Sequence, residues 1–266
     1  RHTAKLMKKV YICVNVVPRM HFKKLIFVLA VLALGTFSSR AQDADYNFRA
    51  RFDAAKQLYL QGMYASAESE FEKLADEVKD KHTLFYSEIL ANKVMCAIAI
   101  GRDNVEGLVY DFETRFPNDP QLAMVKFYMA THQFDQAEYE KARTSFAGIN
   151  EKNLYRTVKN EYAFKYAYCN MRVGNMQDAL GGFSQVMDAE LNQYSYPATY
   201  YTAYIYYLNK DFSDAFSYFT KARRDSRFTD MSDYYATECK FMMSDWNYVI
   251  ERGIAVYDKL TATWPA

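Results

Sequence analysis

The chain has 266 residues, half of them hydrophobic, with only 9 Gly and 5 Pro. An all-β protein of this length needs more turn residues, so the composition favours long helices with short connections. Residues 1–41 contain eight Lys or Arg and no acidic residue, which leaves 25 basic and 32 acidic residues in 42–266, a formal net charge of −7. We therefore expect no nucleic acid partner, because the acidic part has no run of Lys or Arg.

The first predicted element is a secretory signal peptide over residues 20–41. Lys23 and Lys24 form a positively charged start, ten apolar residues follow (25–34, LIFVLAVLAL), and Ser39-Arg40-Ala41 is a small-x-small cleavage site. A permanent anchor is the weaker alternative, because a membrane-spanning helix needs roughly 20 apolar residues. No Cys follows where a lipoprotein would carry its lipid. We expect an exported protein, periplasmic or peripherally associated with an outer membrane, with no integral span after cleavage.

The predicted signal peptide separates a short upstream segment from the mature chain. Residues 1–19 precede the initiator candidate Met20, and we expect them to lie outside the natural protein. Residues 42–266 form the predicted mature chain. Its end shows no polar capping helix of the kind that closes repeat arrays, so we expect 42–266 to be the amino-terminal part of a longer chain.

A recurring helix pattern fills the mature chain. Phe212, Ala215, Phe219 and Ala222 follow one another at steps of three, four and three, which places them on one face of a helix. Six sets of this kind occur, and their first members are Tyr64, Arg102, Tyr139, Met176, Phe212 and Trp246. Successive first members are separated by 38, 37, 37, 36 and 34 residues. A period of this length predicts stacked units of supersecondary structure.

Another helical stretch precedes each of these helices. It ends at a short polar break, as at Gln61-Gly62-Met63 and Asn209-Lys210-Asp211. A small residue stands nine positions before most first members, namely Ala55, Ala130, Ala167, Ala203 and Thr237. Antiparallel helices about 8–10 Å apart need small side chains at their crossing and large ones beside it. The sequence therefore predicts helical hairpins.

These hairpins resemble tetratricopeptide repeats, whose second helix carries a characteristic Ala and Phe. The pair is present as Ala67/Phe71, Ala142/Phe146, Ala179/Phe183 and Ala215/Phe219. The first-helix Trp of the family is absent. The resemblance covers residues 48–263, in units 48–81, 86–119, 123–156, 160–193, 196–229 and 230–263. It implies an all-α, right-handed superhelical solenoid of about six degenerate hairpins, similar to exported proteins of Bacteroidetes-like bacteria.

The resemblance also implies a function. In this family the first helices line a concave groove, so we expect a non-enzymatic scaffold that binds a protein or peptide there, in an envelope assembly. The predicted contacts are Phe127, Phe164, Tyr168, Tyr200, Tyr204, Tyr207 and Tyr234. Tyr200, Tyr204 and Tyr207 share one helix face. The same tyrosines can instead pack between neighbouring helices, and both interpretations stay open.

Motifs of catalysis and metal binding are absent from the sequence. His82 and His132 stand alone outside the leader, and no HExxH, GxGxxG, GxxxxGK[ST] or GxSxG motif occurs. Three cysteines of the mature chain lie in apolar helical stretches without a CxxC pair, so we expect buried thiols at Cys96, Cys169 and Cys239. We expect no enzymatic activity, cofactor or metal.

Two alternative functions differ in kind from a protein-binding scaffold. The first is a glycan-binding helical-repeat protein of a nutrient-uptake system, in which aromatic side chains stack on sugars. Such proteins carry a lipidated Cys and large insertions between helices, and neither is seen in this sequence. In the second alternative, the repeats localise a further domain beyond Ala266.

Overall fold

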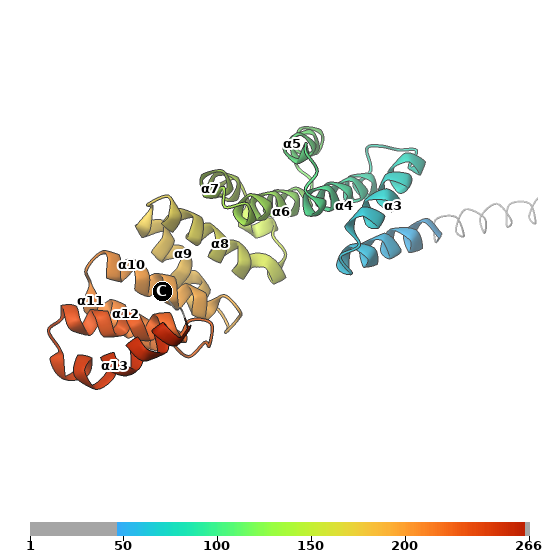
Figure 1. Cartoon of the computed structure of the whole chain (residues 1–266). Helices are drawn as coiled ribbons and strands as arrows, with labels where there is room; N and C mark the ends of the chain where they lie inside the picture. Colours follow the sequence, from blue (N-terminus) through green and yellow to red (C-terminus); the bar gives the residue numbers. More distant parts are fainter. Residues whose placement is uncertain (1–46, 264–266) are drawn as a thin grey trace, which may run out of the picture. The chain divides into compact units, whose positions relative to one another are not determined.

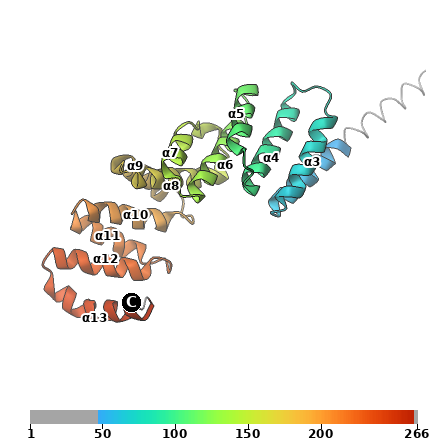
Figure 2. The same ribbon diagram turned by 45° about the horizontal axis from the view of Figure 1, so that its top comes forward.

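The computed structural model describes residues 47–263, and every regular element in that range is a helix (Figures 1 and 2). The predicted signal peptide (20–41) and the upstream segment (1–19) lie outside the described residues. Between residues 47 and 263, no helix is both long enough and apolar enough to cross a membrane. The chain divides after Glu77 into two compact units.

The described part of the first unit is one helical hairpin. A helix over residues 47–60 turns into α3 (Tyr64–Glu77). The rings of Phe52 and Phe71 meet edge to face between the helices, with centroids 5.7 Å apart. Arg51 pairs with Glu77 at 2.7 Å on the hairpin surface. Aromatic packing inside and an ion pair outside therefore join its two helices.

The second unit is a series of five hairpins. Its helices are α4 (Leu84–Ile100), α5 (Val105–Arg115), α6 (Leu122–Asp135), α7 (Tyr139–Ala147), α8 (Lys159–Arg172), α9 (Met176–Asp188), α10 (Ser195–Leu208), α11 (Phe212–Ala222), α12 (Thr229–Met242) and α13 (Trp246–Thr263). Two short 3₁₀ turns, Glu151–Asn153 and Arg156–Val158, precede α8. Each hairpin, from α4–α5 to α12–α13, packs against the next in chain order.

The predicted small-and-aromatic pattern forms the core of these hairpins. In α7, Ala142 and Phe146 are fully buried, and the same holds for Ala179 and Phe183 in α9 and for Ala215 and Phe219 in α11. The small residues predicted for the first helices are buried with them, at Ala130, Ala167 and Ala203. The all-α hairpin fold predicted from the sequence is confirmed.

A left-handed residue ends every first helix of the six hairpins. Three are Gly62, Gly101 and Gly174, with φ of 78°, 74° and 92°, and three carry side chains: Ala137, Lys210 and Ser244, with φ of 60°, 66° and 60°. The following N–H group donates to a carbonyl five residues back, as from Asp211 to Tyr206 at 2.9 Å. This pattern closes the helix and turns the chain into the second helix.

The second predicted repeat differs from the others in register. Its first helix begins at Leu84, two residues before the predicted unit, because Thr83 caps it by accepting the Tyr86 N–H at 3.2 Å. Arg102 was predicted to open the second helix, but α5 begins at Val105. The remaining members of that set, Val105, Val109 and Phe112, are buried as expected.

Candidate functional site

Three consecutive first helices, α8, α10 and α12, present a run of aromatic side chains. We call this surface the aromatic face and define it as Phe164, Tyr168, Tyr200, Tyr204, Tyr207 and Tyr234. All six were predicted as partner contacts. Their helical spacing directs them to one side of each helix, and contacts between hairpins decide whether the three helices form one surface.

Tyr201 joins the rings of α8 to those of α10. Its ring centroid lies 4.9 Å from that of Tyr168, 6.2 Å from that of Phe164 and 5.3 Å from that of Tyr200. Offset and edge-on contacts at these distances are favourable beyond the area that they bury. The α8 and α10 parts of the aromatic face are therefore in direct contact.

Tyr235 has the same role between α10 and α12. Its centroid lies 5.6 Å from that of Tyr204, 5.1 Å from that of Tyr207 and 5.2 Å from that of Tyr234. Burial, and then the neighbouring carboxylate of Glu238, raises the pKa of the hydroxyls of Tyr207 and Tyr234. The aromatic face is thus one connected surface across three hairpins.

The exposed fraction of each predicted contact shows whether its side chain lies at the surface or in the interior. Tyr234 is 38% exposed, and Tyr168, Tyr200, Tyr204 and Tyr207 are half-buried. Phe164 is buried, at 9%. The seventh predicted contact, Phe127, is 1% exposed and packs against Phe146 with centroids 6.4 Å apart. Phe127 therefore belongs to the interior of its hairpin, and we do not include it in the aromatic face.

Burial also sets the protonation of the tyrosines. It is the main cause that raises the pKa of Tyr201 to about 12, with the neighbouring Tyr168 adding to the effect. Burial and then the neighbouring carboxylate of Glu238 raise the pKa of Tyr207 to about 12. The pKa of Tyr200 is raised by burial as well. These hydroxyls stay neutral at physiological pH and offer hydrogen bonds without charge.

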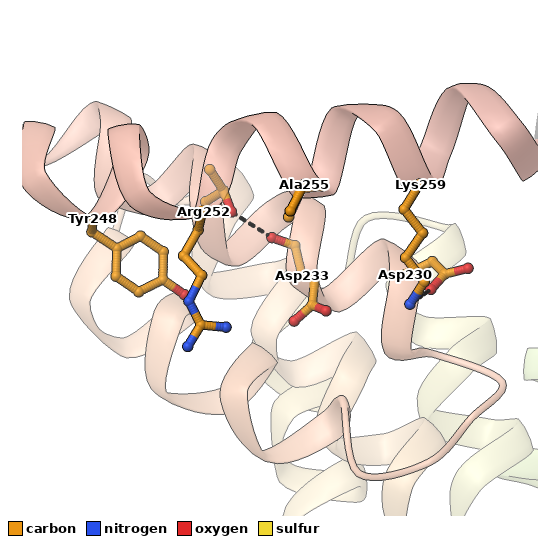
Figure 3. Close-up of a pocket in the computed structure, with 8 residues that line it drawn as sticks. Asp230, Asp233, Tyr248, Arg252, Ala255 and Lys259 are labelled. Carbon is orange, nitrogen blue, oxygen red and sulfur yellow. Dashed lines mark hydrogen bonds and ion pairs between the residues drawn. The ribbon is translucent and has the colours of Figure 1, made fainter.

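Two hollows lie at the last hairpin. An apolar one of about 300 Å³ continues from the aromatic face, and its lining residues are Tyr234, Thr237, Glu238, Phe241, Val249, Gly253, Val256 and Tyr257. We call it the terminal pocket. The other, of about 130 Å³, is charged and lies between α12 and α13 (Figure 3). There Lys259 pairs with Asp230 at 2.5 Å, and Thr237 donates to the backbone oxygen of Asp233 at 2.8 Å.

Comparison with known proteins defines the fold. No sequence model of a protein family matches the chain, and no curated protein matches it by sequence. PilF of Pseudomonas aeruginosa matches in structure with a TM-score of 0.56 and 12% identity, over 84% of this chain and 94% of PilF. A tetratricopeptide repeat protein from Parabacteroides merdae matches with a TM-score of 0.54 and 13% identity, over 81% and 79%. The fold is that of a tetratricopeptide repeat solenoid.

The tetratricopeptide fold explains which residues the sequence analysis missed. Tyr201 and Tyr235 stand 34 residues apart, each one position after a predicted contact, and they face the preceding hairpin. Arg172 lies over the ring of Tyr139 at 4.6 Å and donates to the Tyr168 hydroxyl at 3.3 Å. The 34-residue spacing was the available signal for the two tyrosines. The Arg172 contacts have no periodic signal, because they depend on side-chain conformation.

Two other kinds of functional group in the hairpins are clusters of metal-binding side chains and cysteine thiols. In the described part of the chain, no three His, Cys, Asp or Glu side chains gather where they could hold a metal ion. The predicted burial of Cys96, Cys169 and Cys239 is confirmed. Burial raises the pKa of the Cys169 thiol to about 12 and that of Cys239 to about 11, so both are protonated at neutral pH.

Proposed function

We propose that this protein is an exported, non-enzymatic scaffold that binds a polypeptide along its aromatic face. The observation that carries the proposal is the continuity of that face, in which rings from α8, α10 and α12 touch through Tyr201 and Tyr235. A surface that extends over three hairpins suits an extended chain or a helix better than a small metabolite. The tetratricopeptide fold is compatible with such a role, but the role rests on the side chains.

The chemistry of the face favours a polypeptide partner. Half-buried tyrosines combine a rigid apolar ring with a wet hydroxyl, and such residues dominate the binding energy of protein interfaces. Glu238 supplies one carboxylate among neutral hydroxyls. We therefore propose a partner segment with apolar side chains and a nearby Lys or Arg.

The proposed location rests on the sequence. Residues 20–41 have the charge, apolar length and cleavage site of a signal peptide. Together with the acidic net charge of 42–266, they support export and a role in an envelope assembly. The protein is then periplasmic or held at the periphery of an outer membrane by its partner.

The test removes two rings of the aromatic face from one helix. Tyr204 and Tyr207 lie on α10, and their ring contacts are with Tyr235 and Phe212. Capture of partner proteins from a native envelope extract by the Tyr204→Ala/Tyr207→Ala variant should fall at least about tenfold, with helicity retained, because aromatic anchors of this kind each contribute strongly to binding. Quantitative mass spectrometry of the captured proteins is the measurement.

The matched control removes two rings from the other side of the same hairpin. Tyr206 and Tyr218 stack on each other with centroids 5.5 Å apart and are not part of the aromatic face. The Tyr206→Ala/Tyr218→Ala variant should capture the same proteins as the unchanged chain. Equal capture by both double variants would refute the proposal, and binding to a glycan array that depends on Tyr204 and Tyr207 would favour a sugar ligand instead.

A further inference from the structure

Four of the six hairpins between residues 47 and 263 contain the same pair of rings. An aromatic residue of the first helix meets a phenylalanine of the second, with centroids 5.6–6.4 Å apart; the pairs are Phe52/Phe71, Phe127/Phe146, Phe164/Phe183 and Tyr200/Phe219. Each of these second-helix phenylalanines is fully buried. The ring therefore fills a space that the hairpin geometry creates each time.

The last hairpin keeps the first ring and lacks the second. Tyr234 stands 34 residues after Tyr200, and Gly253 stands 34 residues after Phe219. The terminal pocket lies over Gly253, and the other residues that line it are offset by 34 from residues around Phe219. The absent phenylalanine ring thus accounts for the position of the pocket.

The same position is where a further helix docks in the preceding hairpins. Phe146, Phe183 and Phe219 each also contact a tyrosine of the next first helix, with centroids 5.8, 6.0 and 5.2 Å apart; those tyrosines are Tyr162, Tyr201 and Tyr235. A helix that packs on α13 in the same manner would carry an aromatic side chain to the mouth of the terminal pocket.

The surface of α13 around the pocket is apolar. Trp246, Ile250, Ile254 and Tyr257 are between 53% and 73% exposed and follow one another at helical spacing. Phe216, the residue of α11 equivalent to Ile250, contacts Tyr248 of the next hairpin. A contiguous apolar stripe of this kind marks an interaction surface, unlike single exposed side chains.

We propose that the terminal pocket receives an aromatic side chain from an α-helical segment of a partner, whose ring takes the position that Phe219 holds in the preceding hairpin. The proposal rests on the proposed function and specifies the partner's chemistry. A dry cavity of about 150 Å³ is known to hold benzene, so about 300 Å³ accommodates a phenylalanine ring. Glu238 lines the pocket and favours a Lys or Arg next to that ring.

The pocket can be filled from within the chain. A Cβ built on Gly253 would lie 3.8 Å from Val249 Cγ1, an ordinary van der Waals contact. Gly253→Phe should therefore be tolerated and place its own ring where the partner's would bind. Gly253→Leu fills the pocket with an aliphatic group and serves if the phenylalanine variant folds poorly. Gly253→Ala adds one carbon and leaves most of the space open.

The experiment uses two blocked, alanine-based helical peptides with Lys for solubility, one with a single central Phe and one with Ala in its place. The unchanged chain should bind the Phe peptide roughly tenfold more tightly, because one ring is buried. Gly253→Phe and Gly253→Leu should abolish this preference, and Gly253→Ala should retain it. Fluorescence anisotropy measures both affinities, and circular dichroism confirms helicity.

Equal affinity for the two peptides in the unchanged chain would overturn the proposal, as would a Phe preference that survives both filling variants. Self-association that Gly253→Phe abolishes would also overturn it, because the occupant would then be a second copy. Tyr204 and Tyr207 do not line the pocket, so their double variant should keep the Phe preference. The two proposals can fail separately. If the double variant loses its native partners but the unchanged chain shows no preference for the Phe peptide, the proposal for the pocket is refuted and the proposal for the aromatic face is supported.

Discussion

Three of the six hairpin turns place a residue with a side chain where the backbone is left-handed. Ala137, Lys210 and Ser244 have φ of 60–66°, in the position that Gly occupies in the other three turns. A Cβ makes this region unfavourable by roughly 1–2 kcal/mol. The repeated hydrogen-bond pattern of the turn holds these residues there, so each such turn is a local source of strain.

Ala137→Gly should therefore stabilise the protein by about 0.5–1 kcal/mol, after allowance for the greater freedom of Gly in the unfolded chain. Ala54→Gly is the matched control, since Ala54 lies exposed in the interior of the helix over residues 47–60 and should lose about the same amount. Urea unfolding midpoints measure both variants. A lower midpoint for Ala137→Gly would show that the turn carries no strain.

The same turns show which backbone conformations of single residues can be predicted from the sequence. Gly62, Gly101 and Gly174 indicated their turns directly, because Gly favours the left-handed region. Ala137 and Ser244 gave no such signal, since their conformation is imposed by packing of the hairpin around them. Phe127 shows the same limit in the site, because its helix position allowed a surface contact and the neighbouring Phe146 placed it in the core.

At the scale of elements, the crossing of α8 and α9 depends on one glycine. A Cβ on Gly182 would lie 2.8 Å from the Cβ of Ala167, closer than such atoms approach in proteins. Gly181 is next to it and exposed, and a Cβ there has open space around it. Alanine substitutions at these two neighbouring positions therefore distinguish the effect of helix packing from the effect of helix propensity.

Gly182→Ala should destabilise the protein by about 1–3 kcal/mol, because it forces the two helices apart. Gly181→Ala should stabilise it by up to about 1 kcal/mol through helix propensity alone. Differential scanning calorimetry of the two variants gives the comparison. Similar shifts in both would mean that α8 and α9 do not cross closely at Gly182.

The existence of the helices, and the buried side of the second helices that carry both Ala and Phe, were predictable from the sequence, because the small-and-aromatic spacing repeats in four of the described hairpins. Two features were not. The start of α4 depends on the single cap at Thr83, and α5 begins three residues later than its periodic pattern suggested. The joining of the aromatic face depends on Tyr201 and Tyr235, which contact a neighbouring hairpin, and a pattern within one hairpin carries no information about that contact.

At the scale of the whole molecule, the same hairpin design produces both the interior and the aromatic face. Phenylalanines of the second helices fill the junctions between hairpins, and tyrosines of the first helices extend the same aromatic packing to the surface. The last hairpin departs from the design at Gly253, where the ring is absent. In the proposed complex, the partner lies along the aromatic face and inserts one aromatic side chain into the terminal pocket.

Site-specific photo-crosslinking in the native cell tests whether polypeptide binds along the aromatic face. A benzophenone amino acid replaces Tyr204 on α10, keeping an aromatic ring, or Tyr110 on α5, which is 68% exposed and outside the face. Illumination should produce a discrete covalent adduct to a protein from position 204 and none from position 110. Adducts from position 110 alone, or no protein adduct from position 204, would contradict binding at this surface.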